Sequence, residues 1–137
     1  MMARLLAVKG WSVMVFDYSW LIGGPQGSGV DTAANIFSRV GTKLGYHVFG
    51  KREYHSNIKG LHSYFVVRLS DNKIRSNVNG ANIMVAFDAE TMIRHGLEIL
   101  KDGAIIYDSS IVNTSIDEIP TIEADHRVRL HEFFKSK

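Results

Sequence analysis

Short apolar runs alternate along this chain with segments whose apolar residues recur at helical spacing. Five runs predict strands, at residues 20–22, 46–50, 63–69, 83–87 and 104–107. The run at 63–69 is rich in aromatic and β-branched residues, which favours a strand. The run at 83–87 is apolar throughout, which predicts a strand buried on both faces.

Three segments between or after these runs have the pattern of helices. Apolar residues from Ala33 to Val40 predict a helix over Val30 to Leu44, with Gly45 ending it. A second helix is expected from Asp88 to about Leu100, with acidic residues in its first turn and Gly103 ending the unit. A last amphipathic helix is expected over residues 123–134.

Alternating strands and helices predict a three-layer α/β/α fold, Rossmann-like, with helices on both faces of the sheet. One connection departs from the pattern. Residues 51–62 have no helical period and are too few for a helical crossover, so the strands on either side are expected to be antiparallel. The sheet should therefore be mixed but mostly parallel.

The length of 137 residues suits one domain with a single core. We expect residues 19–137 to form it, incomplete at its C-terminal end, and residues 1–18 to be an extension with an edge strand at Ser12–Phe16. The apolar stretch after Arg4 is cut at Lys9, which is shorter than the roughly 7 residues that a signal peptide needs. No run approaches the roughly 18 apolar residues of a membrane span.

Composition excludes several kinds of site. A net charge of +2 gives no reason to expect nucleic acid or an anionic membrane as a partner. The chain has no cysteine, so it can form no disulfide, thiolate zinc site or cysteine-ligated cluster, and this suits a reducing cytoplasm. Its six histidines lack the spacing of known metal motifs, so no metal site is expected.

A glycine-rich loop between the first strand and first helix is the strongest candidate for a binding site. Gly23, Gly24, Gly27 and Gly29 occupy four of seven positions. Backbone N–H groups at the start of a helix can face an anion or a partner. The alternative is that the glycines only allow the helix to pack closely on the sheet. The loop lacks the Lys-Ser/Thr of a P-loop and the order of the dinucleotide fingerprint.

The long connection at residues 51–62 is the second candidate. It carries Lys51, Arg52, Asn57 and Lys59, together with Glu53, a tyrosine and two histidines. Long loops in compact domains are usually functional or disordered. Since this one flanks buried strands, we expect an ordered binding surface, with a merely solvated loop as the alternative.

Taken together, these segments resemble the γ domain of 2-oxoacid:ferredoxin oxidoreductases. The resemblance covers about residues 19–107 and is carried, in order, by Ile22-Gly-Gly-Pro-Gln-Gly-Ser-Gly29, Asp31-Thr-Ala-Ala34, Gly45-Tyr46, Gly50, Arg52-Glu-Tyr-His-Ser-Asn-Ile-Lys-Gly60, His62-Ser-Tyr-Phe65, Arg75-Ser76 and Phe87-Asp-Ala-Glu-Thr91. It is closest to the archaeal form, in which this domain begins a fused α subunit. The chain would be the first portion of such a subunit or a separate, shortened version. Pro25 and Leu61 depart from the family's pattern.

The resemblance implies a part in an enzyme that oxidatively decarboxylates 2-oxoacids such as pyruvate to acyl-coenzyme A and reduces ferredoxin. It places thiamine diphosphate, magnesium and the iron–sulfur cluster on partner domains, the α and β subunits, and none of them on this chain alone. This domain would support assembly and coenzyme A access at its surface, without catalytic residues. The residues expected at that surface are Gly24, Gln26, Gly27, Ser28, Gly29, Lys51, Arg52, Asn57 and Lys59.

Other readings remain open on the residues alone. The glycine loop would equally serve a stand-alone α/β module that binds a nucleotide or another anion without redox chemistry. Both loops could instead make only subunit contacts in a structural domain. On the oxidoreductase reading, the isolated chain should be inactive and expose an apolar patch beside the glycine loop and residues 54–58, with self-association as a consequence.

Overall fold

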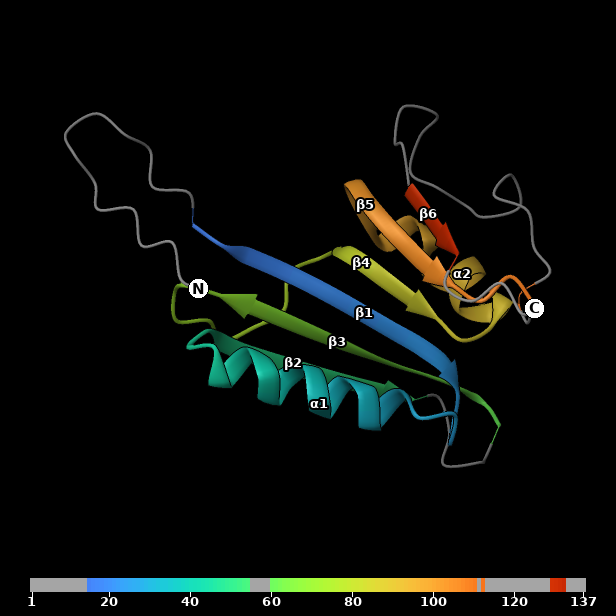
Figure 1. Ribbon diagram of the computed structural model, residues 1–137, viewed down its shortest axis with the longest axis horizontal. Helices are drawn as coiled ribbons and strands as arrows, with labels where there is room; N and C mark the ends of the chain where they lie inside the picture. The colour runs from blue at the N-terminus through green and yellow to red at the C-terminus, as the bar shows by residue number, and fades with distance from the viewer. Residues whose placement is uncertain (1–14, 55–59, 111, 113–128, 133–137) are drawn as a thin grey trace.

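The computed structural model describes residues 15–54, 60–110, 112 and 129–132. A six-stranded sheet forms its centre, in the order β2-β3-β1-β4-β5-β6 (Figure 1). The elements follow the chain as β1 (Asp17–Pro25), α1 (Val30–Lys43), β2 (His47–Tyr54), β3 (His62–Ser70), β4 (Ala81–Ala86), α2 (Ala89–His95), the 3₁₀ turn η1 (Gly96–Glu98), β5 (Ile99–Tyr107) and β6 (Arg129–Glu132).

Among the described strands, only β3 runs opposite to the others. It pairs antiparallel with both β1 and β2, whereas β1, β4, β5 and β6 pair in parallel in that order. The mixed, mostly parallel sheet is therefore confirmed. The antiparallel β2–β3 pair follows from the connection between Tyr54 and His62, which is too short for a crossover helix.

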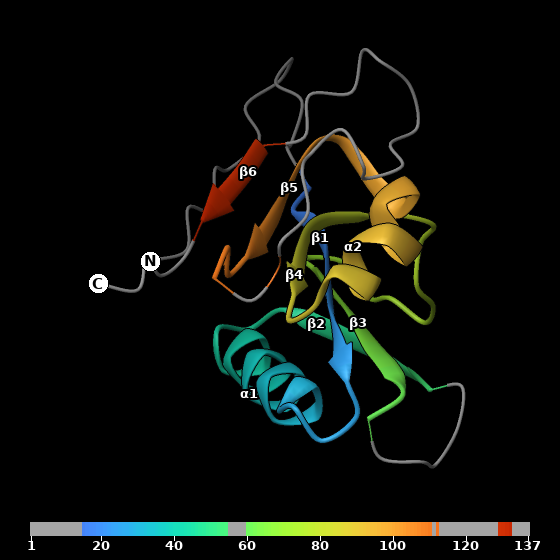
Figure 2. The ribbon, with the colours of Figure 1, turned by 90° about the vertical axis from the view of Figure 1, so that its right-hand side faces the viewer.

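The two helices cover opposite faces of this sheet (Figure 2). Alternate residues of β1 supply both interfaces, as the period of a strand requires. Trp20 and Ile22 pack in one cluster with Val30 of α1, while Leu21 packs in the other with Met92 of α2. The three-layer arrangement is therefore confirmed.

The C-terminal part of the described chain corrects one expectation. A helix was expected over residues 123–134, but Arg129–Glu132 is the strand β6, which pairs in parallel with β5 from Ala104 to Tyr107. The remaining residues of that expected helix lie outside the described ones. Pairing with the exposed edge of β5 satisfies backbone groups that a local helical pattern does not take into account.

The second helix is shorter than expected. Helix α2 ends at His95, and Ile99 and Leu100 already belong to β5. Ile99 is only 3% exposed, because it packs in the cluster beneath α2. Gly103 consequently lies inside β5 instead of ending a helix. Burial in the sheet has outweighed helical periodicity here.

The first helix lies close to its predicted bounds. Helix α1 ends at Lys43, followed by Gly45 at φ 90°, as the pattern predicts. Of the edge strand expected at residues 12–16, only Val15 and Phe16 are described, and neither belongs to a strand. None of the described helices has the length and apolar character needed to cross a lipid bilayer.

Candidate functional site

The glycine loop divides into a packed half and an open half. A Cβ on Gly23 would lie 2.5 Å from the Cγ2 of Thr91, and one on Gly24 would lie 2.7 Å from the Cβ of Phe87. These two glycines therefore allow the end of β1 to approach the start of α2. The packing interpretation holds for this half of the loop.

Gly27 and Gly29 form the open half. Their φ angles are 93° and 101°, in the left-handed region that favours glycine. No atom of the described residues lies within 4 Å of a Cβ placed on either one. Gly29 is also the N-cap of α1, and no side chain caps that position. This half of the loop presents backbone at the start of a 14-residue helix.

The end of the second loop lies against the first. The Gln26 N–H donates to the Leu61 carbonyl at 2.8 Å, and the Gly60 N–H donates to the Gln26 carbonyl at 3.3 Å. Within the glycine loop, the Ser28 N–H donates to the Pro25 carbonyl at 3.0 Å. The structure thus brings the two candidate loops together. Asn57 and Lys59 lie outside the described residues.

The two basic residues of β2 are separated by the sheet. Lys51 forms an ion pair with Glu53, on the face that carries α2. The next residue, Arg52, points to the other face, where its Nη2 lies 2.7 Å from the Oδ2 of Asp31 in the first turn of α1. Of these two basic residues, Arg52 therefore lies near the start of α1, next to Gly27 and Gly29, and Lys51 does not.

A buried histidine pair lies on the face opposite α1. The Nε2 atoms of His62, the first residue of β3, and His95, the last of α2, are 2.9 Å apart. Their exposed fractions are only 4% and 5%. The Nδ1 of His95 lies 2.7 Å from the Oε1 of Glu98. Burial and the neighbouring His95 lower the pKa of His62, against opposing effects of Asp88 and Glu90.

Polar side chains continue from this pair to a pocket of about 240 Å³. The Tyr64 ring lies 4.3 Å from that of His95, and its hydroxyl donates to Glu53 at 2.9 Å. Burial and this bond raise the pKa of Tyr64 to about 12. Tyr64, Glu53 and Glu98 line the pocket together with Lys51. Hydrogen bonds and ring contacts thus connect the pocket with the histidine pair.

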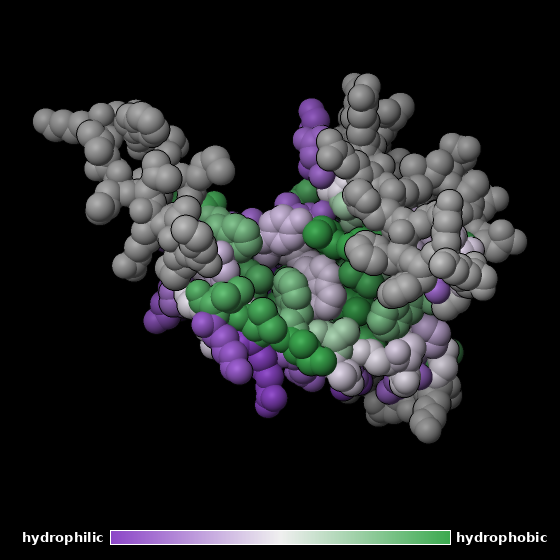
Figure 3. Space-filling model, in the orientation of Figure 1, coloured by the Kyte–Doolittle hydropathy of each residue, from purple (hydrophilic) through white to green (hydrophobic). Residues whose placement is uncertain are grey.

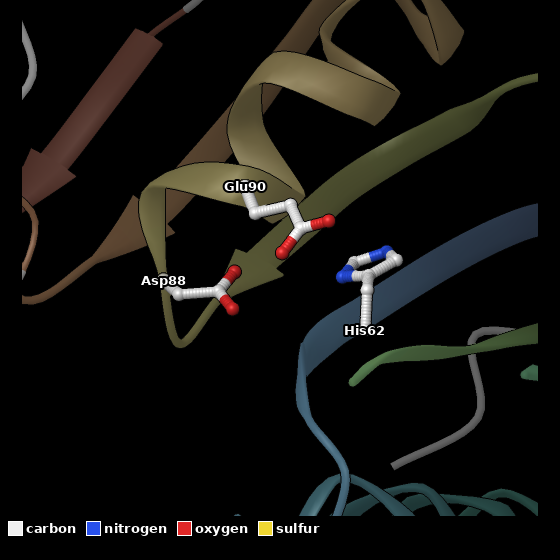
Figure 4. Close-up of side chains that lie close together, drawn as sticks. All are labelled: His62, Asp88 and Glu90. Carbon is white, nitrogen blue, oxygen red and sulfur yellow. The ribbon is translucent and has the colours of Figure 1, made fainter. Parts of the chain in front are cut away.

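Sequence reasoning missed this second group. His62, Asp88 and Glu90 bring their ligand atoms within 4.8 Å of one another (Figure 4). Motif spacing could not find them, because the pairing of β3 with β1 and of β1 with β4 assembles them from segments far apart. The signal in the sequence that could have found them was the histidine at the start of β3 and the two carboxylate residues at the start of α2.

Comparison with known proteins agrees with this architecture. The family model described as pyruvate ferredoxin/flavodoxin oxidoreductase matches residues 19–134. The chain belongs to this family. The α subunit of 2-oxoacid:ferredoxin oxidoreductase 1 from Sulfurisphaera tokodaii is 46% identical over 115 residues, which cover 84% of the chain and 18% of that subunit. The corresponding subunit from Saccharolobus solfataricus is 44% identical over 119 residues, covering 87% of the chain and 18% of the subunit.

Solved structures in this family share the fold. The chain superposes on the 2-oxoglutarate:ferredoxin oxidoreductase from Magnetococcus marinus with a TM-score of 0.72 and 22% identity, covering 85% of the chain and 19% of that protein. The γ subunit of a keto/oxoacid ferredoxin oxidoreductase from Geobacter sulfurreducens gives 0.69 and 18%, covering 86% and 61%. The chain thus spans about a fifth of the length of the curated relatives it matches.

The family domain also exposes apolar side chains on the outer side of α1. Ile36, Val40 and Leu44 follow one another at intervals of four residues, with exposed fractions of 59%, 49% and 54%. Apolar atoms gather over α1 in Figure 3. We expected such a patch beside the glycine loop and residues 54–58. The side chains of residues 54–58 lie outside the described part of the chain, so that part of the prediction stays untested.

Proposed function

We propose that this chain is the γ-type domain of a 2-oxoacid:ferredoxin oxidoreductase. The complete enzyme would oxidatively decarboxylate a 2-oxoacid, pyruvate among the possible substrates, to acyl-coenzyme A and reduce ferredoxin. Membership of the family over residues 19–134 carries this proposal. We propose a cytoplasmic location for the enzyme.

The chemistry itself is assigned to partner domains. The chain has no cysteine, whose thiolate is the usual cluster ligand, so its residues do not fit an iron–sulfur cluster. Decarboxylation and electron transfer would depend on thiamine diphosphate, magnesium and a cluster held elsewhere in the enzyme. This domain would contribute subunit contacts and a surface for coenzyme A. The isolated chain should therefore reduce no ferredoxin or dye when given 2-oxoacid and coenzyme A.

The open half of the glycine loop is the part of the surface best suited to coenzyme A. The structure from Magnetococcus marinus was solved with coenzyme A bound. In this chain, Gly27 and Gly29 present backbone at the start of α1, where the helix dipole favours phosphate. Arg52 stands at the same end of α1 and could add a charge-assisted hydrogen bond.

Arg52 can bind a phosphate only if its ion pair with Asp31 can be shared or broken. Their ion pair is about half-exposed, with side-chain exposed fractions of 40% for Arg52 and 45% for Asp31. Pairs of this kind contribute only about 0–1 kcal/mol, so a phosphate could share or replace the carboxylate. Lys51 lies on the other face and is not expected to contact the same phosphate.

The test is a steady-state comparison in the reconstituted complex. Arg52→Ala should raise the KM for coenzyme A and leave the KM for the 2-oxoacid nearly unchanged. Lys51→Ala tests the opposite face, and Arg39→Ala is the matched control on the exposed side of α1. Both should leave the two KM values unaltered.

Three other outcomes would redirect the proposal. Loss of assembly in Arg52→Ala would assign the residue to a subunit contact instead of coenzyme A. Full assembly with an unaltered coenzyme A dependence would contradict both roles. Tight binding of a nucleotide by the isolated chain, without association with the other subunits, would favour the stand-alone anion-binding module.

A further inference from the structure

The hydrogen bonds of the buried histidine pair determine where its protons lie. An ionised carboxylate only accepts, so Glu98 requires a proton on the Nδ1 of His95, 2.7 Å away. The Nε2 of a neutral His95 is then an acceptor. The Nε2 of His62, at 2.9 Å, must donate to it. With this arrangement, the Nδ1 of a neutral His62 carries a lone pair.

That lone pair faces two carboxyl groups. Figure 4 shows one ring nitrogen of His62 turned toward Asp88 and Glu90, whose side chains point back toward it. The ligand atoms of the three residues lie within 4.8 Å of one another. Three electron-rich groups so close together repel unless a cation or a proton lies between them.

We propose that His62, Asp88 and Glu90 bind a divalent transition-metal ion, with zinc as the best-suited ion. Imidazole nitrogen with carboxylate oxygens is a donor set that suits zinc, whereas magnesium and calcium prefer oxygen ligands alone. Each carboxyl group has an oxygen for the ion. The Oδ1 of Asp88 accepts from the N–H and hydroxyl of Thr91, and the Oε1 of Glu90 contacts Arg94, which leaves Oδ2 and Oε2.

The buried imidazole distinguishes this group from an ordinary helix start. Asp88 and Glu90 alone would be explained by their favourable position at the amino end of α2. His62 has no such role, and it is 4% exposed. Glu90 is exposed and Asp88 half-buried, so an ion can enter from solvent.

A different placement of the protons would account for the same geometry without a metal ion. If His95 were an imidazolium, it would donate to His62, whose Nδ1–H would then face the carboxylates. This arrangement needs one more proton on the buried pair. The two distributions differ at the Nδ1 of His62, which carries a proton in this one and a lone pair in the other. Arg94 opposes a metal ion, but its salt bridge to Glu90 is exposed and exchangeable.

The test uses the untagged 137-residue chain, stripped of metal by a chelator. Cobalt is titrated first, because its visible absorption reports nitrogen and oxygen ligation, and zinc then competes for the site. We expect one equivalent to bind. Glu90→Gln and Asp88→Asn should each weaken zinc binding at least about tenfold. Asparagine is as good an N-cap as aspartate, so the second variant keeps α2 capped.

Two further variants test whether zinc binding depends on the orientation of His62 and not on histidines in general. Glu98→Gln leaves the three ligands in place but weakens the orientation of His95 and hence of His62, so zinc binding should weaken about tenfold. His47→Gln is the control, because His47 is an exposed histidine of β2. Its zinc affinity should equal that of the wild type.

Ring-nitrogen NMR gives an independent readout of the same proposal. Zinc should shift the Nδ1 resonance of His62 and leave the proton on Nε2. Unchanged ring spectra at saturating zinc, absence of saturable binding, or equal affinities of wild type and Glu90→Gln would each overturn the site. Weakening by His47→Gln to the same degree would place the ion elsewhere on the surface.

Discussion

The contact between Gly23 and Thr91 offers the most quantitative test of the loop's packed half. Gly23→Ala places a methyl group 2.5 Å from the Cγ2 and 2.9 Å from the Oγ1 of Thr91. Real Cβ atoms essentially never come closer than 3.0 Å. One of the two elements, β1 or α2, must therefore shift.

Thr91 cannot yield at little cost. It is 0% exposed, and its hydroxyl donates to the Oδ1 of Asp88 at 2.6 Å. Extra methyl groups in a well-packed core cost about 1–3 kcal/mol, so we expect Gly23→Ala to lower the free energy of unfolding by about 2 kcal/mol. The backbone of Gly23 adds no strain, because its φ lies outside the left-handed region.

A double-mutant cycle isolates the steric contact. Thr91→Ala removes both close atoms but also the hydroxyl bond, and should cost about 1–2 kcal/mol by itself. In the double variant the two closest atoms are absent and only the Cβ of residue 91, at 3.3 Å, stays near the new methyl group, so the combined loss should be smaller than the sum by about 1 kcal/mol or more. Urea unfolding of the four proteins, followed by circular dichroism, measures the coupling.

The control cycle uses a glycine on the other face. A Cβ on Gly41 would lie 2.5 Å from the Cδ2 of Leu69, far from Thr91. Gly41→Ala and Thr91→Ala should therefore be additive within about 0.5 kcal/mol. Additivity of Gly23→Ala with Thr91→Ala would refute the reasoning, since it would mean that the two side chains do not compete for one space.

Three other predictions follow from the described contacts. Gly29→Val should destabilise the protein by about 1–3 kcal/mol through its positive φ, while Ser28→Ala should change stability little, and equal small effects in thermal unfolding would show an ordinary loop. Arg68 lowers the pKa of Asp17, so their pair should stabilise above the unfolded pKa and lose this effect as pH falls below it. Asp17→Asn should thus cost about 1 kcal/mol at pH 7 and less at pH 3 in urea unfolding, allowing for its exposure; an equal cost at both pH values would contradict this. Val40→Glu should reduce self-association of the isolated chain in analytical ultracentrifugation, because it interrupts the exposed apolar row on α1, and unchanged association would assign it to another surface.

Local sequence patterns were sufficient to predict the layered fold and to single out the glycine loop. The helical spacing from Ala33 to Val40 and the glycine at Gly45 predicted α1 nearly to its ends. The short link between residues 51 and 62 predicted the antiparallel pair β2–β3. These features depend on the period of one segment or the length of one connection, which are properties of neighbouring residues.

Tertiary structure decided what several strands build together. Arg129–Glu132 forms β6 because the edge of β5 is available, a fact that its own residues do not contain. Lys51 and Arg52 were grouped as one basic site, but the alternation of a strand sends them to opposite faces. The histidine pair arises only where β3 and α2 meet. Burial and long-range pairing determine these positions, and a pattern read along a single chain reports neither.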